Sequence, residues 1–80
     1  MKDQDARQAV QAAIRLVAPD LEPEDLEGRA RLRQDLEMDS LDFLRLVETI
    51  AQSTGVDIPE RDYPAVATVD GLVSYLVNRG

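Results

Sequence analysis

The stretch Leu36-Glu37-Met38-Asp39-Ser40-Leu41-Asp42-Phe43-Leu44 decides the fold, because an irregular segment ends in it and an amphipathic helix begins in it. An Asp or Ser directly before a run of periodic apolar residues is a helix N-terminal signal. Asp39, followed three residues later by Asp42, resembles a capping box with an acid at its far position. The first amides of a helix lack intrahelical partners and carry partial positive charge, so a phosphate ester on the Ser40 hydroxyl would meet a favourable field.

The helix that follows has one apolar face and one leucine outside it. At about 100° per residue, an apolar stripe about 160° wide is predicted to face the core. Its members are Phe43, Leu44, Leu46, Val47, Ile50 and Ala51. Leu41 falls on the other side of the helix, between Arg45 and Glu48. A single exposed leucine ordinarily carries no meaning, but one directly after a candidate modified serine is a candidate docking contact.

The segment Asp39-Ser40-Leu41-Asp42 and the apolar stripe after it resemble the acyl carrier proteins, in which the serine of an Asp-Ser-Leu motif carries 4′-phosphopantetheine. The resemblance covers about residues 4 to 78, in size, acidity, helix order and position of the serine. It implies that Ser40 bears the phosphopantetheine and that acyl groups travel as thioesters on its terminal thiol. The family usually has Gly where this chain has Glu37, so the resemblance does not imply the backbone conformation before Ser40.

The resemblance also implies partners: a phosphopantetheinyl transferase, and the enzymes that load and transfer acyl groups. The expected surface for them is made of Asp39, Leu41, Asp42, Arg45 and Glu48. Asp39 before the serine is more typical of acyl carriers than of peptidyl carriers, where His is common. Carriers of fatty acid synthesis tend to have an acid and an apolar residue at the positions of Arg45 and Glu48.

Several functions therefore stay open at this point. A polyketide, modified-lipid or amino-acid-loading pathway is as well supported as general fatty acid synthesis. A peptidyl or aminoacyl carrier of a dedicated pathway is one alternative. The other is an unmodified helical interaction domain, in which Ser40 only caps a helix.

Composition excludes several other classes of function. Eighty residues allow one small core, so we expect a single domain over residues 1–80. The chain has no Cys and no His, and its only Lys is Lys2, so Ser40 cannot be the nucleophile of a Ser-His-Asp triad and no enzyme is expected. Net charge is −7, and residues 35–80 hold nine acids against three Arg, which disfavours nucleic acid as a partner.

No metal site and no membrane span are expected. Asp35, Glu37 and Asp39 alternate as in an EF-hand loop, but that loop then requires Gly and Glu at the positions of Ser40 and Leu46. No apolar run is long enough to cross a bilayer, and residues 1–5 do not resemble a signal peptide. We therefore expect a cytoplasmic protein, and we expect it to be a monomer.

Periodicity predicts three helices, and the resemblance adds a small all-α four-helix bundle in which a short third helix precedes the last one. The first helix starts at Asp3 or Asp5 and ends before Pro19. The second runs from Ser40 to about Thr54, with Gly55 as its stop. The last follows the N-cap Thr68 and ends at residues 78–80.

The connecting segments are predicted to be a long loop and a single turn. The loop from Ala18 to Met38 contains scattered Leu anchors and one helical turn near residues 29–34. Its alternating Arg29, Arg31 and Arg33 can be read as a binding patch, but we interpret them as solvated side chains that offset neighbouring acids. Residues 60–63 are predicted to form one helical turn, which Pro64 ends.

Overall fold

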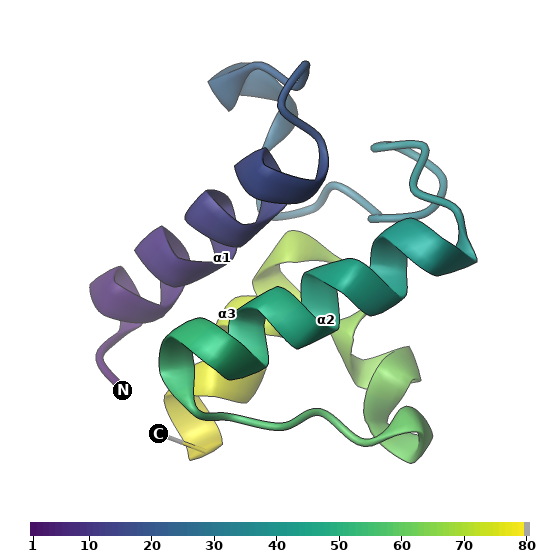
Figure 1. The fold of residues 1–80 in the computed structure, drawn as a ribbon. Helices are drawn as coiled ribbons and strands as arrows, with labels where there is room; N and C mark the ends of the chain where they lie inside the picture. Colours follow the sequence, from purple (N-terminus) through teal and green to yellow (C-terminus); the bar gives the residue numbers. More distant parts are fainter. Residues whose placement is uncertain (80) are drawn as a thin grey trace.

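Three α-helices surround the core in the computed structural model, which describes residues 1–79, apart from the side chain of Pro23. They are α1 (Asp3–Val17), α2 (Ser40–Thr54) and α3 (Val69–Arg79). Two 3₁₀ helices, η1 (Pro23–Asp25) and η2 (Glu60–Val66), lie in the connections. In Figure 1, α2 lies in front of α3, and α1 lies above α2 in this view.

The predicted fold class is confirmed. The described residues contain helices and one isolated bridge between Arg31 and Thr68, but no strand. The predicted bounds of α2 are those of the structure, including the stop at Gly55, whose φ of 77° is the left-handed conformation that glycine adopts at helix ends.

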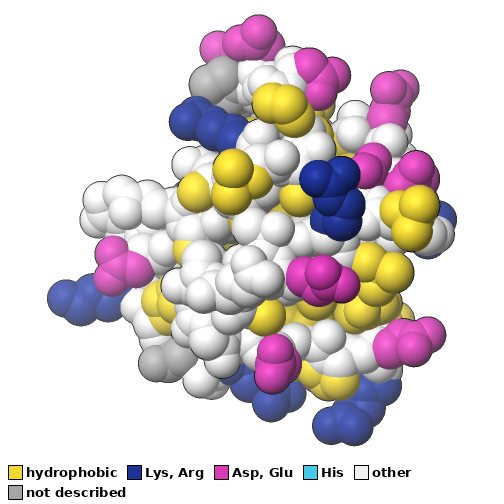
Figure 2. Space-filling view, in the orientation of Figure 1, with side chains coloured by type: hydrophobic (Ala, Val, Ile, Leu, Met, Phe, Trp, Pro, Cys, Tyr) yellow, Lys and Arg dark blue, Asp and Glu magenta, His cyan; other side chains and the backbone are white. Residues whose placement is uncertain are grey.

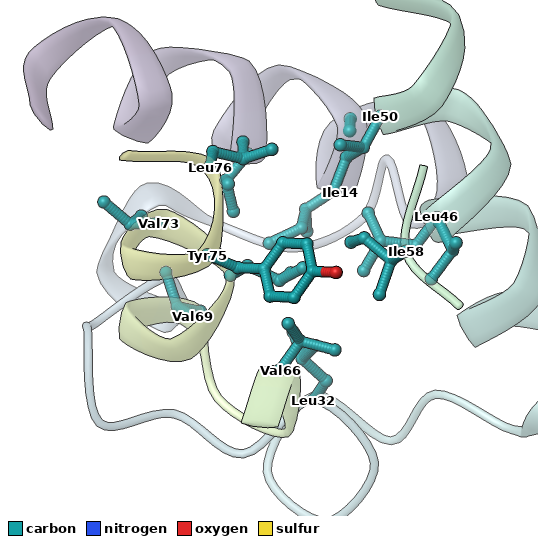
Figure 3. Packing of buried hydrophobic residues seen from close by; sticks show 14 of the residues in the cluster. Ile14, Leu32, Leu46, Ile50, Ile58, Val66, Val69, Val73, Tyr75 and Leu76 are labelled. Carbon is teal, nitrogen blue, oxygen red and sulfur yellow. The ribbon is translucent and has the colours of Figure 1, made fainter. Parts of the chain in front are cut away.

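One apolar core fills the space between the helices, and each helix buries one face in it. The buried residues are Ala6, Val10, Ala13 and Ile14 of α1, Phe43, Leu46, Val47 and Ile50 of α2, and Val69, Leu72, Val73, Tyr75 and Leu76 of α3. Figure 3 shows Ile14, Leu46 and Leu76 directed toward the same interior from their three helices. The small residues Ala6 and Ala13 leave room for the other helices to approach α1.

The long loop before α2 is held against the start of α3 by main-chain hydrogen bonds. The Leu32 N–H donates to the Ala67 carbonyl at 2.9 Å, and the Val69 N–H donates to the Ala30 carbonyl at 3.1 Å. Leu32 is itself fully buried. These contacts join residues more than 30 positions apart, so the loop is ordered by the tertiary structure rather than by its own periodicity.

The structure corrects the predicted turn inside this loop. A hydrogen-bonded turn is found, but over residues 32–35, and it is closed by the Asp35 N–H on the Arg31 carbonyl at 2.8 Å. The Asp35 carboxylate accepts from the Arg31 N–H at 2.8 Å and pairs with the Arg31 guanidinium at 3.2 Å. The hydrogen bonds from Arg31 lower the pKa of Asp35 below its ordinary value. The one-turn helix η1 was not predicted.

The end predicted for the short helix before α3 was wrong. η2 continues through Pro64 to Val66, whereas the prediction ended this element at Tyr63. Proline lacks an N–H and would break an α-helix, but its fixed φ near −65° lies within the 3₁₀ range. A short 3₁₀ helix therefore tolerates Pro64.

Side-chain contacts hold η2 against α3 on one side and α2 on the other. The Tyr75 hydroxyl of α3 donates to Asp62 Oδ2 at 2.7 Å, and this bond to a carboxylate raises the pKa of Tyr75 above 10.0. Arg79 pairs with the same carboxylate at 3.4 Å. On the other side, the rings of Tyr63 and Phe43 pack edge to face with centroids 5.0 Å apart. These contacts place η2 beside the N-terminal half of α2.

Candidate functional site

The candidate site begins with the cap of α2. The Asp42 N–H donates to Asp39 Oδ1 at 2.8 Å, which makes Asp39 the N-cap, as its position before the apolar run indicates. The reciprocal bond of a full capping box, from the Asp39 N–H to the Asp42 carboxylate, is absent among the described residues. An Asp is one methylene shorter than the Glu of that motif, so only half of the predicted box forms.

Ser40 is the first residue of α2, and its side chain is exposed. Its hydroxyl oxygen accepts a hydrogen bond from Arg33 Nη2 at 3.2 Å. Because Asp39 provides the cap, the Ser40 hydroxyl is not needed for the helix start. This hydroxyl can therefore be esterified without loss of the cap.

Glu37 shows what the chain does at the position where the family usually has Gly. Its φ is 58°, in the left-handed region, and it is the one non-glycine residue with positive φ among the described residues. Only glycine adopts this conformation without steric cost. The loop before Ser40 thus keeps a conformation that suits Gly, although the residue is Glu.

Glu37→Gly is expected to raise the free energy of unfolding by roughly 0.5–1 kcal/mol. Glycine removes the steric cost of the left-handed backbone, and this gain is larger than the loss from the greater entropy of the unfolded chain. Urea denaturation of the two proteins measures the change. Glu24→Gly, an exposed change in the same loop with no positive φ, is the control and should not stabilise. A Glu37→Gly protein no more stable than the parent would contradict the steric argument.

The predicted partner face is exposed in the structure. Leu41 is 71 % exposed, and Asp39, Arg45 and Glu48 are exposed as well, while Asp42 is half-buried. Figure 2 shows acidic, basic and hydrophobic side chains interspersed on the side where α2 lies in front. This face is therefore not a continuous acidic field. Whether enzymes dock on it stays a prediction.

The structure corrects the predicted role of Leu44. The helical wheel placed Leu44 in the core stripe, but 41 % of it is exposed. Leu44 lies at the edge of the stripe; Tyr63 of η2 packs on the neighbouring Phe43, while Leu44 keeps its contact with solvent. Leu41 and Leu44, one turn apart on α2, together form an exposed apolar pair next to Ser40.

One cavity borders Ser40 and a second, larger cavity adjoins it; the sequence patterns predicted neither. The larger has a volume of about 600 Å³ and is lined by Arg33, Gln34, Met38, Phe43, Tyr63, Pro64 and Ala67. The smaller, of about 320 Å³, is lined by Arg33, Ser40, Phe43, Leu44, Glu60 and Tyr63. Arg33, Phe43 and Tyr63 belong to both, so the cavities adjoin. The candidate serine borders the smaller one.

Two further properties concern the part of the chain that the structure describes. It holds no group of three or more His, Cys, Asp or Glu side chains arranged for a metal ion. None of its helices has the length and apolar character required to cross a membrane.

Comparisons with known proteins agree with this geometry. The family described as "Phosphopantetheine attachment site" matches residues 8–76. The acyl carrier protein of Rubrobacter xylanophilus is 34 % identical over 53 residues, which are 66 % of this chain and 65 % of the relative, just under two thirds of its length. The acyl carrier protein of Bdellovibrio bacteriovorus is 32 % identical over 75 % of this chain and 77 % of its own. That of Zymomonas mobilis is 36 % identical over 70 % and 72 %.

A solved structure shares the fold. The solution structure of a provisionally assigned acyl carrier protein from Anaplasma phagocytophilum superimposes with a TM-score of 0.85, at 24 % identity, over 100 % of this chain and 93 % of the other. Fold and sequence match together define a helical carrier domain of the phosphopantetheine-bearing class. The chain belongs to the acyl carrier protein family. Members of this family are carriers rather than enzymes, and they hold 4′-phosphopantetheine covalently.

Proposed function

We propose that Ser40 is the residue to which this chain attaches 4′-phosphopantetheine, and that the chain carries acyl groups as thioesters on the arm. The observation that carries the proposal is the exposed Ser40 hydroxyl at the first position of α2, beside an Asp39 that caps the helix independently. The partial positive charge of the helix start favours a phosphate there. The family match over residues 8–76 includes this position.

The attachment needs no base from this chain. Ser40 Oγ attacks the phosphorus of coenzyme A that bears the pantetheine. An oxygen–phosphorus bond forms to Ser40, the pyrophosphate bond breaks, and adenosine 3′,5′-bisphosphate leaves. The hydroxyl proton passes to a base of the transferase.

The adjoining cavities give the arm and its acyl group a place to lie. The larger one, of about 600 Å³, has Met38, Phe43 and Tyr63 in its lining. Burial of apolar chain against such side chains is favourable at roughly 25 cal/mol per Å². We propose that an acyl chain shelters there, within a pathway of fatty acid, polyketide or related lipid synthesis. Cytoplasmic location and a monomeric state remain predictions.

We propose that the transferase and the acyl-transfer enzymes dock on the face that contains Leu41. An apolar side chain that loses its water beside the reacting group can be a binding hot spot. Leu41→Ala is therefore expected to lower kcat/KM for phosphopantetheine transfer about tenfold or more, the equivalent of about 1.4 kcal/mol. The rate of mass gain with one transferase measures it. Leu16→Ala, an equally exposed leucine on α1, is the control. Equal rates for the two variants would place docking elsewhere.

The experiment that tests the proposed function is intact-mass measurement after incubation with coenzyme A and a phosphopantetheinyl transferase. The expected result is a gain of one phosphopantetheine mass, which peptide mapping locates on Ser40. A subsequent acyl load should appear as a thioester that hydroxylamine removes. A folded chain that gains no mass, or gains it at another residue, would overturn the proposal.

A further inference from the structure

Arg33 is the loop arginine whose guanidinium reaches the candidate attachment serine. Its Nη2 donates to Ser40 Oγ at 3.2 Å. Arg31, two residues earlier, instead forms an ion pair with Asp35 at 3.2 Å, which agrees with our interpretation that these arginines offset neighbouring acids. Among residues 1–79, no ion pair joins Arg33 to a carboxylate. Unlike Arg31, Arg33 does not neutralise a neighbouring acid, and most of its N–H donors are available to an incoming anion.

The main chain of Arg33 is held in place on both sides. The Leu32 N–H donates to the Ala67 carbonyl at 2.9 Å, and the Leu32 carbonyl accepts from the Met38 N–H at 3.2 Å. The turn that contains Arg33 is closed by the bond from the Asp35 N–H to the Arg31 carbonyl. The guanidinium therefore approaches Ser40 from a fixed attachment point, which lowers the entropy cost of binding there.

A phosphodiester on Ser40 would lie in a mostly acidic environment. Asp39 precedes Ser40 and Asp42 follows two residues later, and like charges repel the new anion. The unesterified oxygens of the phosphodiester are bonded to the phosphorus that Ser40 Oγ would carry, so they are two bonds away from Oγ. A guanidinium already 3.2 Å from that oxygen reaches them by side-chain rotation. Its planar fork matches phosphate oxygens and can bind two of them at once.

We propose that Arg33 is a binding residue for the phosphodiester of the prosthetic group, and that it directs the first segment of the arm toward the cavities lined by Arg33, Phe43 and Tyr63. This inference rests on the proposed attachment at Ser40. Arg33 lines both cavities, so an arm held by it begins on their side of α2. Leu41 lines neither cavity and then stays open to partner enzymes.

The test is ³¹P NMR of the holo protein, prepared with coenzyme A and a transferase, for the parent, R33Q, R33K and R29Q. Arg29 is an exposed arginine of the same loop that does not line either cavity, so R29Q removes the same charge without the contact. The phosphodiester resonance of R33Q is expected to shift away from that of the parent, while R29Q keeps the parental position. R33K, which retains the charge but not the fork, should lie between them.

The dependence of the resonances on salt provides a second measurement on the same proteins. Added NaCl should move the parental resonance toward that of R33Q, because ions screen an exposed pair, and it should leave R33Q nearly unchanged. Identical resonances for parent, R33Q and R29Q, or a parental resonance insensitive to salt, would overturn the role of Arg33. Intact mass separates the two proposals. A missing mass gain refutes attachment at Ser40, whereas a normal gain with identical resonances refutes only the inference about Arg33.

Discussion

Ser40→Ala is expected to abolish the gain of phosphopantetheine mass and to leave the free energy of unfolding within about 0.5 kcal/mol of the parent. The loss is complete because alanine has no oxygen to which the phosphorus can bond. The fold persists because Ser40 is exposed, alanine is a good helix former, and Asp39 still caps α2. Intact mass and chemical denaturation measure the two effects on the same sample.

Ser53→Ala is the matched control for this substitution. Ser53 lies on the same helix, is also exposed, donates to the Ile50 carbonyl at 3.3 Å, and lines neither of the two cavities described above. It should gain the full mass at the parental rate. A mass gain that persists in Ser40→Ala, or that Ser53→Ala loses, would show that the site is assigned to the wrong serine.

Leu46→Ala is expected to lower the free energy of unfolding by about 2–5 kcal/mol. Leu46 of α2 is fully buried in the core, so the substitution loses apolar burial and leaves a cavity that the closely packed neighbours fill only in part. A domain of 80 residues has a total stability on the order of 5–10 kcal/mol, so this is a large fraction of it. Guanidinium denaturation followed by circular dichroism measures the change.

Leu41→Ala removes the same atoms from the same helix and is the control. Because 71 % of Leu41 is exposed, its truncation should cost within about 1 kcal/mol. Stability and recognition should therefore rank the two leucines in opposite order. Equal loss of stability in the two variants would mean that Leu41 is packed against the rest of the protein rather than exposed to solvent.

Local patterns determined the helices and the candidate serine. The bounds of α2 follow from Asp39 at one end and Gly55 at the other, both of which act within one turn of their own position. The apolar spacing of α3 likewise needs no distant partner to be recognised. Since capping and periodicity depend on near neighbours along the chain, the sequence alone was enough to position Ser40 at the start of an amphipathic helix.

Tertiary contacts decided what surrounds that serine. A helical wheel gives the direction of Leu44 but not which segments pack over it, so its exposure follows only from the tertiary structure. The 3.2 Å contact between Arg33 and Ser40 depends on a loop path that the bond from Leu32 to Ala67 holds in place. That bond joins residues far apart in the chain, and no local spacing encodes it. Near neighbours along the chain therefore specify the helices and the position of the candidate serine, whereas the packing of the loop and η2 against α2 specifies the cation and the cavities beside it.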